Sequence, residues 1–311
     1  MAVLVFAPIA MERVWGGRLL ETHFHRSLPD AEAPYGESWE VVDRAEAQSV
    51  VVSGPFSGMT LHELWTEKRE EIFGVGLPLS ERFPLLVKIL DAREDLSIQV
   101  HPPAALAAQL KGEPKTEMWY IAAAQKHARL VVGLRKDATR ESFAAAIENG
   151  SVADLVHEIP VSKGDSIFIP SGRLHAIGAG LLIFEIQQNS DTTYRVFDWN
   201  RVGLDGKARE LHIAESLASI DFFDVEPELD TAQGAVIASC EHFVVERFTL
   251  AAGDSLGLVM PDRFSLLHVV EGAVLDSDGV SWPAGTSLLL PRGEAGIIAE
   301  GNATILRSSI P

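Results

Sequence analysis

The stretch Ser-Ile-Gln-Val-His-Pro at residues 97–102 alternates apolar and polar side chains. Side chains point to opposite faces along a strand, so Gln99 and His101 lie on one side and the neighbouring isoleucine and valine on the other. A strand with one apolar and one polar face suits the wall of a β-barrel beside a cavity. The stretch therefore predicts a mainly β protein with a metal-competent pair facing that cavity.

Composition and charge exclude several classes of protein. The 311 residues suffice for one large domain or two modest ones, with a core that needs no disulfide. A formal net charge of -18 argues against a nucleic-acid partner, which usually requires a basic surface. Cys240 is the only cysteine, and no run of 18 apolar residues indicates a membrane segment. We therefore expect a cytoplasmic protein that makes no contact with membranes.

A second polar strand is expected at residues 115–121, where a period of two places Lys115 and Glu117 on one face. A third motif, residues 164–175, has glycines and a proline that set tight turns around a short strand, and it ends at His175. Lys115 is open to two interpretations, as a solvated lysine at a strand end or as a group that enters the same cavity as Gln99.

The three motifs together supply a candidate metal site. Its four residues offer an amide oxygen, a carboxylate and two imidazoles, from Gln99, His101, Glu117 and His175. This set suits Zn²⁺ and also Mn²⁺, Fe²⁺ or Co²⁺. The chain has ten histidines, and each of these two taken singly is better explained as a buried structural residue, whereas the convergence of three motifs favours a metal site. From the residues alone, both interpretations stay open.

Two further cations stand out. Lys88 interrupts the apolar run of residues 82–90, either because it snorkels to a barrel mouth or because it contacts a substrate phosphate. Arg195 lies in a polar segment, where it is either an anion ligand or the ion-pair partner of Asp191 or Asp198.

Two Gly/Trp clusters, residues 15–17 and 36–40, either shape loops and core or line one wall of the cavity.

Helical periodicity appears only in separate segments of the chain. Helices are expected at residues 60–73, 103–110, 137–159 and 210–217, and a linker at 227–233. We interpret the helices as insertions in a β framework.

An internal repeat predicts the domain organisation. The spacing recurs as Gly164, Pro170 and Gly172 in one copy and Gly285, Pro291 and Gly293 in the other. Gly296 stands in the second copy where His175 stands in the first. Two copies of one supersecondary unit imply two related barrels. We predict a metal-binding domain with helical insertions at residues 1–233 and a degenerate second domain without ligands at 234–311.

These motifs resemble those of a known family. Residues 164–175 are similar to the second signature of the cupin superfamily of small β-barrels (double-stranded β-helices, or jelly rolls). The sequences SIQVHP (97–102), KTEMW (115–119) and QNSDTTYR (188–195) resemble type I mannose-6-phosphate isomerases in their short bacterial form. The two Gly/Trp clusters match that family too. The chain lacks the long helical domain of larger members, so contacts made from that domain cannot be transferred.

The resemblance implies interconversion of mannose 6-phosphate and fructose 6-phosphate through a cis-enediol. It implies one Zn²⁺ per chain, held by Gln99, His101, Glu117 and His175. It also makes Lys115, Arg195 and Asp191 catalytic candidates, and Lys115 and Arg195, together with Lys88, are expected to contact the sugar phosphate. The residue that moves the proton stays open between Lys115, Asp191, Glu117 and a metal-bound water, and the oligomeric state between monomer and homodimer.

Two other functions remain as alternatives at this stage. A non-catalytic regulatory cupin could bind a sugar phosphate without chemistry. Another metal-dependent cupin enzyme, such as a dioxygenase or decarboxylase, would usually ligate its metal through a His-x-His pair, from which Gln99-Val100-His101 departs.

Overall fold

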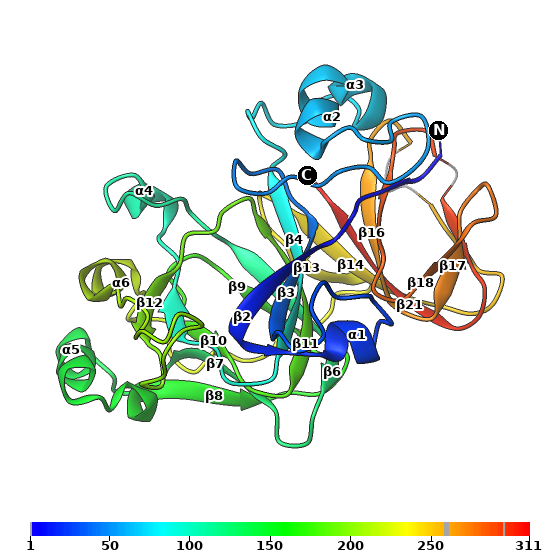
Figure 1. The fold of residues 1–311 in the computed structure, drawn as a ribbon. Helices are drawn as coiled ribbons and strands as arrows, with labels where there is room; N and C mark the ends of the chain where they lie inside the picture. The colour runs from blue at the N-terminus through cyan, green and yellow to red at the C-terminus, as the bar shows by residue number, and fades with distance from the viewer. Residues whose placement is uncertain (1, 258–260, 295) are drawn as a thin grey trace.

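The computed structural model describes residues 2–257, 261–294 and 296–311, and it is mainly β (Figure 1). The strands form four antiparallel sheets. The five-stranded sheet has the order β12 (Tyr194–Phe197), β5 (Ile98–Val100), β10 (His175–Ile177), β7 (Arg129–Leu134), β8 (Val156–Pro160). The first six-stranded sheet has the order β2 (Ile9–Gly17), β3 (Tyr35–Val41), β4 (Leu85–Ala92), β11 (Leu181–Gln188), β6 (Glu117–Ala124), β9 (Ser166–Ile169).

The other two sheets are built mostly from the C-terminal part of the chain. The second six-stranded sheet has the order β1 (Leu4–Val5), β19 (Ser287–Leu290), β16 (Ser265–Glu271), β21 (Ala303–Ser309), β14 (Val244–Leu250), β13 (Val236–Ser239). The four-stranded sheet has the order β15 (Ser255–Leu256), β20 (Ile297–Ala299), β17 (Ala273–Leu275), β18 (Ser281–Pro283). The helices are α1 (Leu19–Thr22), α2 (Leu61–Glu67), α3 (Arg69–Ile72), α4 (Ala104–Ala107), α5 (Arg140–Asn149), the 3₁₀ helix Val152–Leu155 and α6 (Ile213–Ser219).

Alternation along the strands of the first six-stranded sheet separates two cores. Leu90 of β4 and Ile183 of β11 pack with residues of the five-stranded sheet such as Val132. Their neighbours Ile89 and Phe184 point the other way, into a core shared with the second six-stranded sheet. One face of the sheet can therefore carry the polar residues of a cavity while the other packs mainly on apolar residues.

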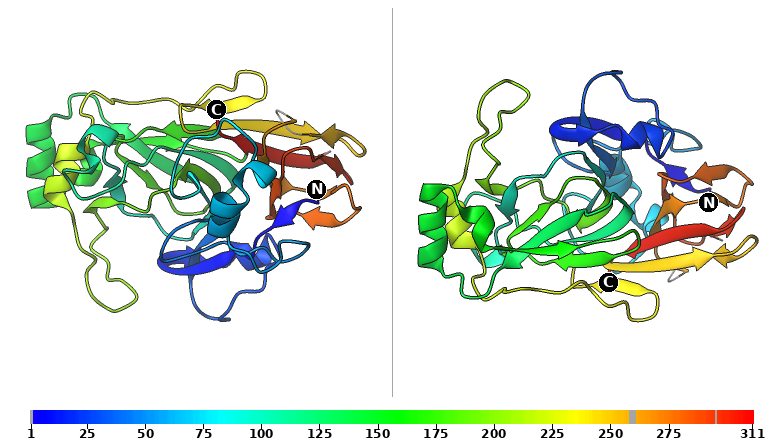
Figure 2. Two further views of the ribbon diagram at one scale, coloured as in Figure 1. Left: turned by 90° about the horizontal axis from the view of Figure 1, so that it is seen from above. Right: turned by 90° about the horizontal axis from the view of Figure 1, so that it is seen from below.

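The sheets stack in layers that run along the molecule. A further apolar core joins the second six-stranded sheet to the four-stranded sheet, with Leu267 and Leu288 packing against Val274. Residues of α5, such as Phe143, cover the outer face of the five-stranded sheet. Figure 2 accordingly shows the green helices at one end of the molecule and the orange C-terminal strands at the other.

Several sequence predictions are confirmed in the helices and strands. The helix expected at 60–73 forms as α2 and α3, and Thr60 begins it with a capping box that includes Glu63. The apolar run at 82–90 is β4, and the chain at 227–233 has no regular structure.

The expected helix at 137–159 is wrong in its last part. Gly150 adopts a left-handed conformation with φ 78° and ends α5. Val156 and Ile159 then bury their side chains in strand β8, which pairs with β7. Their spacing of three residues is helical, and in the strand the two side chains enter different cores, so pairing with β7 decides the structure.

The Gly/Trp clusters lie in strands β2 and β3, so the expectation that they shape loops is wrong, whereas Trp15 and Trp39 are buried in the core as expected. The two strands approach so closely that a Cβ on Gly16 would lie 2.3 Å from the backbone nitrogen of Gly36. A Cβ on Gly36 would in turn lie 2.5 Å from the ring of Trp15. Glycine is required at both positions because no side chain fits between the strands.

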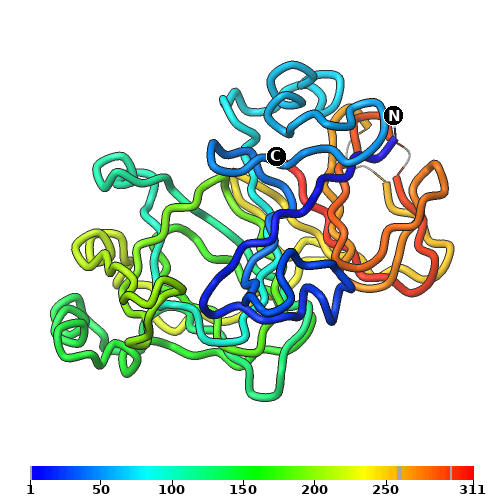
Figure 3. The backbone as a smooth tube through the Cα atoms, in the orientation of Figure 1, coloured from blue at the N-terminus to red at the C-terminus, as the bar shows by residue number. Residues whose placement is uncertain are grey.

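The internal repeat is visible in local structure. β9 and β10 follow Gly164 and Gly172 as β19 and β20 follow Gly285 and Gly293, and all four glycines have positive φ. The division at residue 233 stays a prediction. β1 crosses it by pairing with β19, and Figure 3 shows the blue N-terminal segment beside the orange strands. Among the described residues, no helix is long and apolar enough to cross a membrane.

Candidate active site

A cavity of about 300 Å³ lies between the five-stranded sheet and the first six-stranded sheet. The five-stranded sheet and the loops at its edge contribute Ser97, Gln99, Thr193 and Arg195 to its walls. The first six-stranded sheet contributes Arg13, Trp15, Glu37, Lys88, Trp119 and Glu185. The Gly/Trp clusters therefore do line one wall, as one of the two interpretations of the sequence requires.

His101, Glu117 and His175 form a compact buried cluster whose potential ligand atoms all lie within 4.8 Å of one another. Nε2 of His101 lies 3.6 Å from Oε2 of Glu117, and Nε2 of His175 lies 3.6 Å from Oε1. Glu117 begins β6, His175 begins β10, and His101 directly follows β5. The cluster thus joins the two sheets that enclose the cavity.

Backbone carbonyls orient both imidazoles toward Glu117. Nδ1 of His101 lies 2.8 Å from the carbonyl oxygen of Thr192, and Nδ1 of His175 lies 2.9 Å from that of Arg173. A carbonyl only accepts, so each Nδ1 must carry the proton and each Nε2 keeps its lone pair. Burial lowers the pKa of both histidines, that of His175 to about 3, so both rings are neutral at pH 7.

The cluster fits a divalent metal ion. Among the described residues, Nε2 of His101 and Oε1 of Glu117 are buried without a hydrogen-bond partner, which is costly unless a cation satisfies them. Gln99 is next to the cluster, with Nε2 3.4 Å from Nε2 of His175. A rotation of the amide by 180° would place its oxygen there instead, because the two atoms occupy interchangeable positions.

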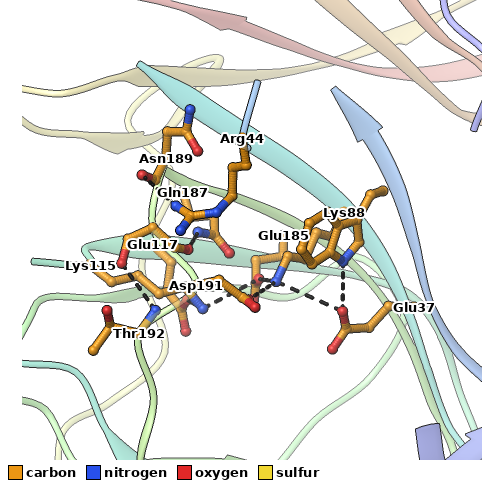
Figure 4. A network of polar contacts seen from close by, with 12 residues as sticks. Glu37, Arg44, Lys88, Lys115, Glu117, Glu185, Gln187, Asn189, Asp191 and Thr192 are labelled. Carbon is orange, nitrogen blue, oxygen red and sulfur yellow. Dashed lines mark hydrogen bonds and ion pairs between the residues drawn. The ribbon is translucent and has the colours of Figure 1, made fainter. Parts of the chain in front are cut away.

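Lys115 and Lys88 are both buried in a network of carboxylates (Figure 4). Nζ of Lys115 lies 2.6 Å from Glu117 and 3.6 Å from Glu185. Burial lowers the pKa of Lys115, but these two carboxylates outweigh it and raise the pKa above its ordinary value. Lys115 is therefore a protonated group inside the cavity, and the solvated strand-end interpretation is wrong.

Lys88 bridges three carboxylates on the same wall of the cavity. Its Nζ lies 3.2 Å from Asp191, 3.8 Å from Glu37 and 4.0 Å from Glu185, and it lies 4.8 Å from the centre of the Trp39 ring. With a side chain only 4% exposed, Lys88 does not snorkel to solvent.

The carboxyl groups around Lys88 differ in their pKa. Burial acts to raise the pKa of Glu37, but Lys88 and Arg13 outweigh it and lower the pKa to about 2. Burial and the negative charge of Glu117 raise the pKa of Glu185, against the opposing effect of the two lysines. Glu185 is thus the carboxyl group of this network that most readily holds a proton.

Arg195 forms no ion pair with a carboxylate in the described part of the chain. Its Nε donates to Oγ of Ser97 at 3.3 Å and its Nη1 to the carbonyl oxygen of Glu210 at 2.9 Å. Asp198, one of the two partners expected from the sequence, instead binds Arg201 and Arg209. Arg195 is therefore left as a cation facing the cavity.

The structure brings all eight sequence-predicted residues to this one cavity or to the metal cluster beside it. Sequence reasoning missed Arg13, Glu185 and Arg209. Glu185 had a usable signal, because it is the one charge in the apolar strand β11 and lies opposite Lys88 in register. Lys88 and Lys115, both expected from the sequence to contact the sugar phosphate, are each paired with carboxylates.

Comparison with known proteins gives a consistent result. Residues 4–118 match the family described as "Phosphomannose isomerase type I, catalytic domain". Mannose-6-phosphate isomerase ManA of Bacillus subtilis is 38% identical over 99% of this chain and 98% of its own length. A mannose-6-phosphate isomerase of Streptococcus mutans is 34% identical over 96% of this chain and 95% of its own.

Solved structures show the same fold. The crystal structure of the mannose 6-phosphate isomerase from Bacillus subtilis matches all of both chains with a TM-score of 0.88 and 31% identity. A putative mannosephosphate isomerase from Archaeoglobus fulgidus, 20% identical over 99% of this chain and 97% of its own, has a TM-score of 0.79 and supports the fold alone. On this full-length identity, the chain belongs to the type I phosphomannose isomerase family.

Proposed function

We propose that this protein is a metal-dependent aldose-ketose isomerase that interconverts mannose 6-phosphate and fructose 6-phosphate. The observation that carries the proposal is the placement of the buried His-Glu-His cluster beside an unpaired arginine and two buried lysines in one cavity. Its full-length relatives bear the name mannose-6-phosphate isomerase, which supports the same substrate.

One divalent ion per chain, zinc, would be held by His101, Glu117 and His175, with Gln99 as the fourth ligand. The donor set of two imidazoles, a carboxylate and an amide oxygen suits zinc. A bound zinc ion supplies Lewis-acid stabilisation of negative charge on the sugar oxygens.

The reaction moves a proton between C1 and C2 through a cis-enediol, so the site needs an acid-base group. Lys115 is a poor base, because Glu117 and Glu185 keep it protonated. We assign to it the stabilisation of negative charge on O1 or O2. Asp191 is the stronger candidate for the base, because its side chain is 42% exposed and is held toward the cavity by Lys88.

The sugar phosphate would be held by Arg195, and its hydroxyl groups by the lysine and carboxylate network. Arg195 makes no ion pair with a carboxylate of the described residues, so an anion can pair with it without displacing a partner. This local arrangement reconciles a phosphorylated substrate with a net charge of -18.

A coupled assay with mannose 6-phosphate tests the proposal. We expect turnover by the zinc-loaded protein, its loss after treatment with a chelator and its recovery on addition of zinc. Activity that is unchanged without oxygen would separate isomerisation from oxygenase chemistry. A protein that binds the sugar phosphate without converting it would be a regulatory cupin instead.

The domain organisation, the cellular location and the oligomeric state are also proposals. We propose that residues 1–233 and 234–311 each form a cupin-type barrel, and the repeated glycine and strand pattern supports this. Among the described residues the strands pair as four open sheets, so each barrel would consist of two facing sheets. A cytoplasmic location and a monomer or homodimer are our remaining expectations.

A further inference from the structure

Arg209 lines the same cavity as Arg195, Ser97 and Thr193, but the proposed chemistry gives it no role. It lies near the end of the loop that connects β12 to α6, close to the bridge between Val202 and Ala208. This loop projects from the body of the molecule (Figure 2). The loop therefore contributes a second guanidinium to the part of the cavity where Arg195 lies.

Asp198 holds the guanidinium of Arg209 in place. Nε of Arg209 donates to Oδ2 of Asp198 at 2.6 Å, and Nη2 donates to Oδ1 at 2.5 Å. Nη1 has no hydrogen-bond acceptor in the part of the chain that the structure describes. A side chain fixed by two bonds loses little freedom when it binds a ligand through its remaining N–H groups.

The charges around Asp198 are unbalanced. Its single carboxylate serves two arginines, Arg201 and Arg209, while Arg195 pairs with no carboxylate of the described residues. Burial and then the positive charge of Arg209 lower the pKa of Arg195. Like charges kept this close in a partly buried site are costly, and a dianion between them removes the cost.

The opposite wall of the cavity carries carboxylates. Glu37, Glu185 and Asp191 surround Lys88 there and would repel a phosphate group. Their oxygens can instead accept hydrogen bonds from sugar hydroxyls. The two walls therefore distinguish the ends of a sugar phosphate.

We propose that Arg209 binds the phosphate group of the sugar phosphate together with Arg195, and that it makes this enzyme prefer phosphorylated over unphosphorylated sugars. The inference rests on the proposed function, and it adds a specificity-determining residue to that site.

Arg209→Gln and Arg201→Gln form a matched pair for the test. Both arginines bind Asp198, but only Arg209 lines the cavity. For Arg209→Gln we expect the KM for mannose 6-phosphate to rise about ten- to hundredfold, the effect of losing one charge-assisted hydrogen bond. The kcat should change by less than about threefold, and the inhibition constant of inorganic phosphate should rise with KM.

Unphosphorylated mannose at high concentration serves as the second substrate. Its kcat/KM should be the same for the wild-type protein and Arg209→Gln, because mannose has no group for Arg209 to bind. Arg201→Gln should behave as wild type with both substrates. Arg209→Lys, which keeps the charge but loses the planar fork, should fall between the wild-type protein and Arg209→Gln.

Three results would overturn the inference while the proposed function stands. The first is an unchanged KM in Arg209→Gln, and the second is an equal loss of kcat/KM with both substrates. The third is an equal rise of KM in Arg201→Gln, which would show that the effect acts through Asp198. A wild-type protein that does not convert mannose 6-phosphate would overturn the proposed function and this inference with it.

Discussion

Oε1 of Glu117 lies 3.6 Å from Nε2 of His175, although the two residues begin strands of different sheets. Both side chains are fully buried, and the imidazole is turned toward the carboxylate by a hydrogen bond on its far side. The distance is too long for a direct hydrogen bond and leaves the facing lone pairs for a cation. The cluster therefore depends on how the two sheets are packed together.

Removal of one imidazole should abolish metal binding. We expect His175→Ala and His101→Ala to lose the bound metal and activity together, since each removes one ligand and leaves Glu117 buried beside an empty space. Elemental analysis of the purified variants measures this directly. His242→Ala, which changes a partly exposed histidine outside the cluster, is the control. A variant of His101 or His175 that retained one metal ion per chain would show that the residue is not a ligand.

Arg195→Ala should leave the fold intact and remove most turnover. Within the described part of the chain the side chain bonds to Ser97 and a backbone carbonyl alone, so its loss costs little stability, whereas the substrate loses a cation. We expect kcat/KM to fall at least about a hundredfold, because the phosphate group of the substrate loses a charge-assisted hydrogen-bond donor. Circular dichroism checks the fold, and Arg195→Lys should recover part of the activity. An unchanged kcat/KM would contradict the assignment.

Thr192 should affect zinc affinity, because its backbone carbonyl orients His101. Its carbonyl oxygen orients His101, and its Oγ1 accepts a hydrogen bond from the backbone nitrogen of Glu113 at 3.0 Å. Thr192→Val keeps the shape but loses that acceptor, so we expect zinc affinity to fall about tenfold. Thr192→Ser keeps the acceptor and should bind zinc like the wild type. Calorimetric titration of the metal-free proteins compares the two, and equal affinities would remove this role from the hydroxyl group.

Asp91 should make stability depend on pH. Burial raises its pKa from 3.8 to about 6, against the backbone hydrogen bond that it accepts from Leu19. Below about pH 4 the carboxyl is protonated in both folded and unfolded states, and above about pH 6 the folded state alone carries a buried charge. Its contribution to the free energy of unfolding therefore falls by about 3 kcal/mol as pH rises through this range.

Asp91→Asn isolates this effect, because asparagine stays neutral and its amide oxygen can still accept from Leu19. The unfolding free energy of the variant, relative to the wild type, should increase between pH 4 and pH 7. Urea unfolding at both pH values measures the difference. A constant difference would mean that the carboxyl of Asp91 ionises in the folded state at its ordinary pKa.

Truncation after residue 235 should yield an insoluble or inactive protein. Phe264 of the removed segment packs on Phe73 and Phe83, with ring centres 5.1 and 5.6 Å apart, and β1 would lose β19. The single change Phe264→Ala is expected to cost about 3–5 kcal/mol for the same reason. Soluble yield and the coupled assay measure the result. A soluble, active fragment would show that the first domain is self-sufficient.

Local patterns in the sequence predict those features of this protein that depend on residues close together along the chain. Alternation placed Gln99 beside the cavity and Lys115 on the same face as Glu117, because a strand exposes every second side chain to one side. The cap at Thr60 and the repeated glycines were readable for the same reason, since each acts within a few residues. The metal cluster was proposed on these grounds, and the structure brings its residues together.

The tertiary structure decided everything that depends on which segments meet. Val156 and Ile159 became a strand because β7 offers them hydrogen bonds, which their own spacing does not reveal. Lys88 proved to be buried because three carboxylates from distant segments surround it. Arg195 likewise has no ion pair with Asp198, because Asp198 binds Arg201 and Arg209 instead. Charge pairing and burial are long-range properties, so a sequence read locally identifies the groups but not their partners.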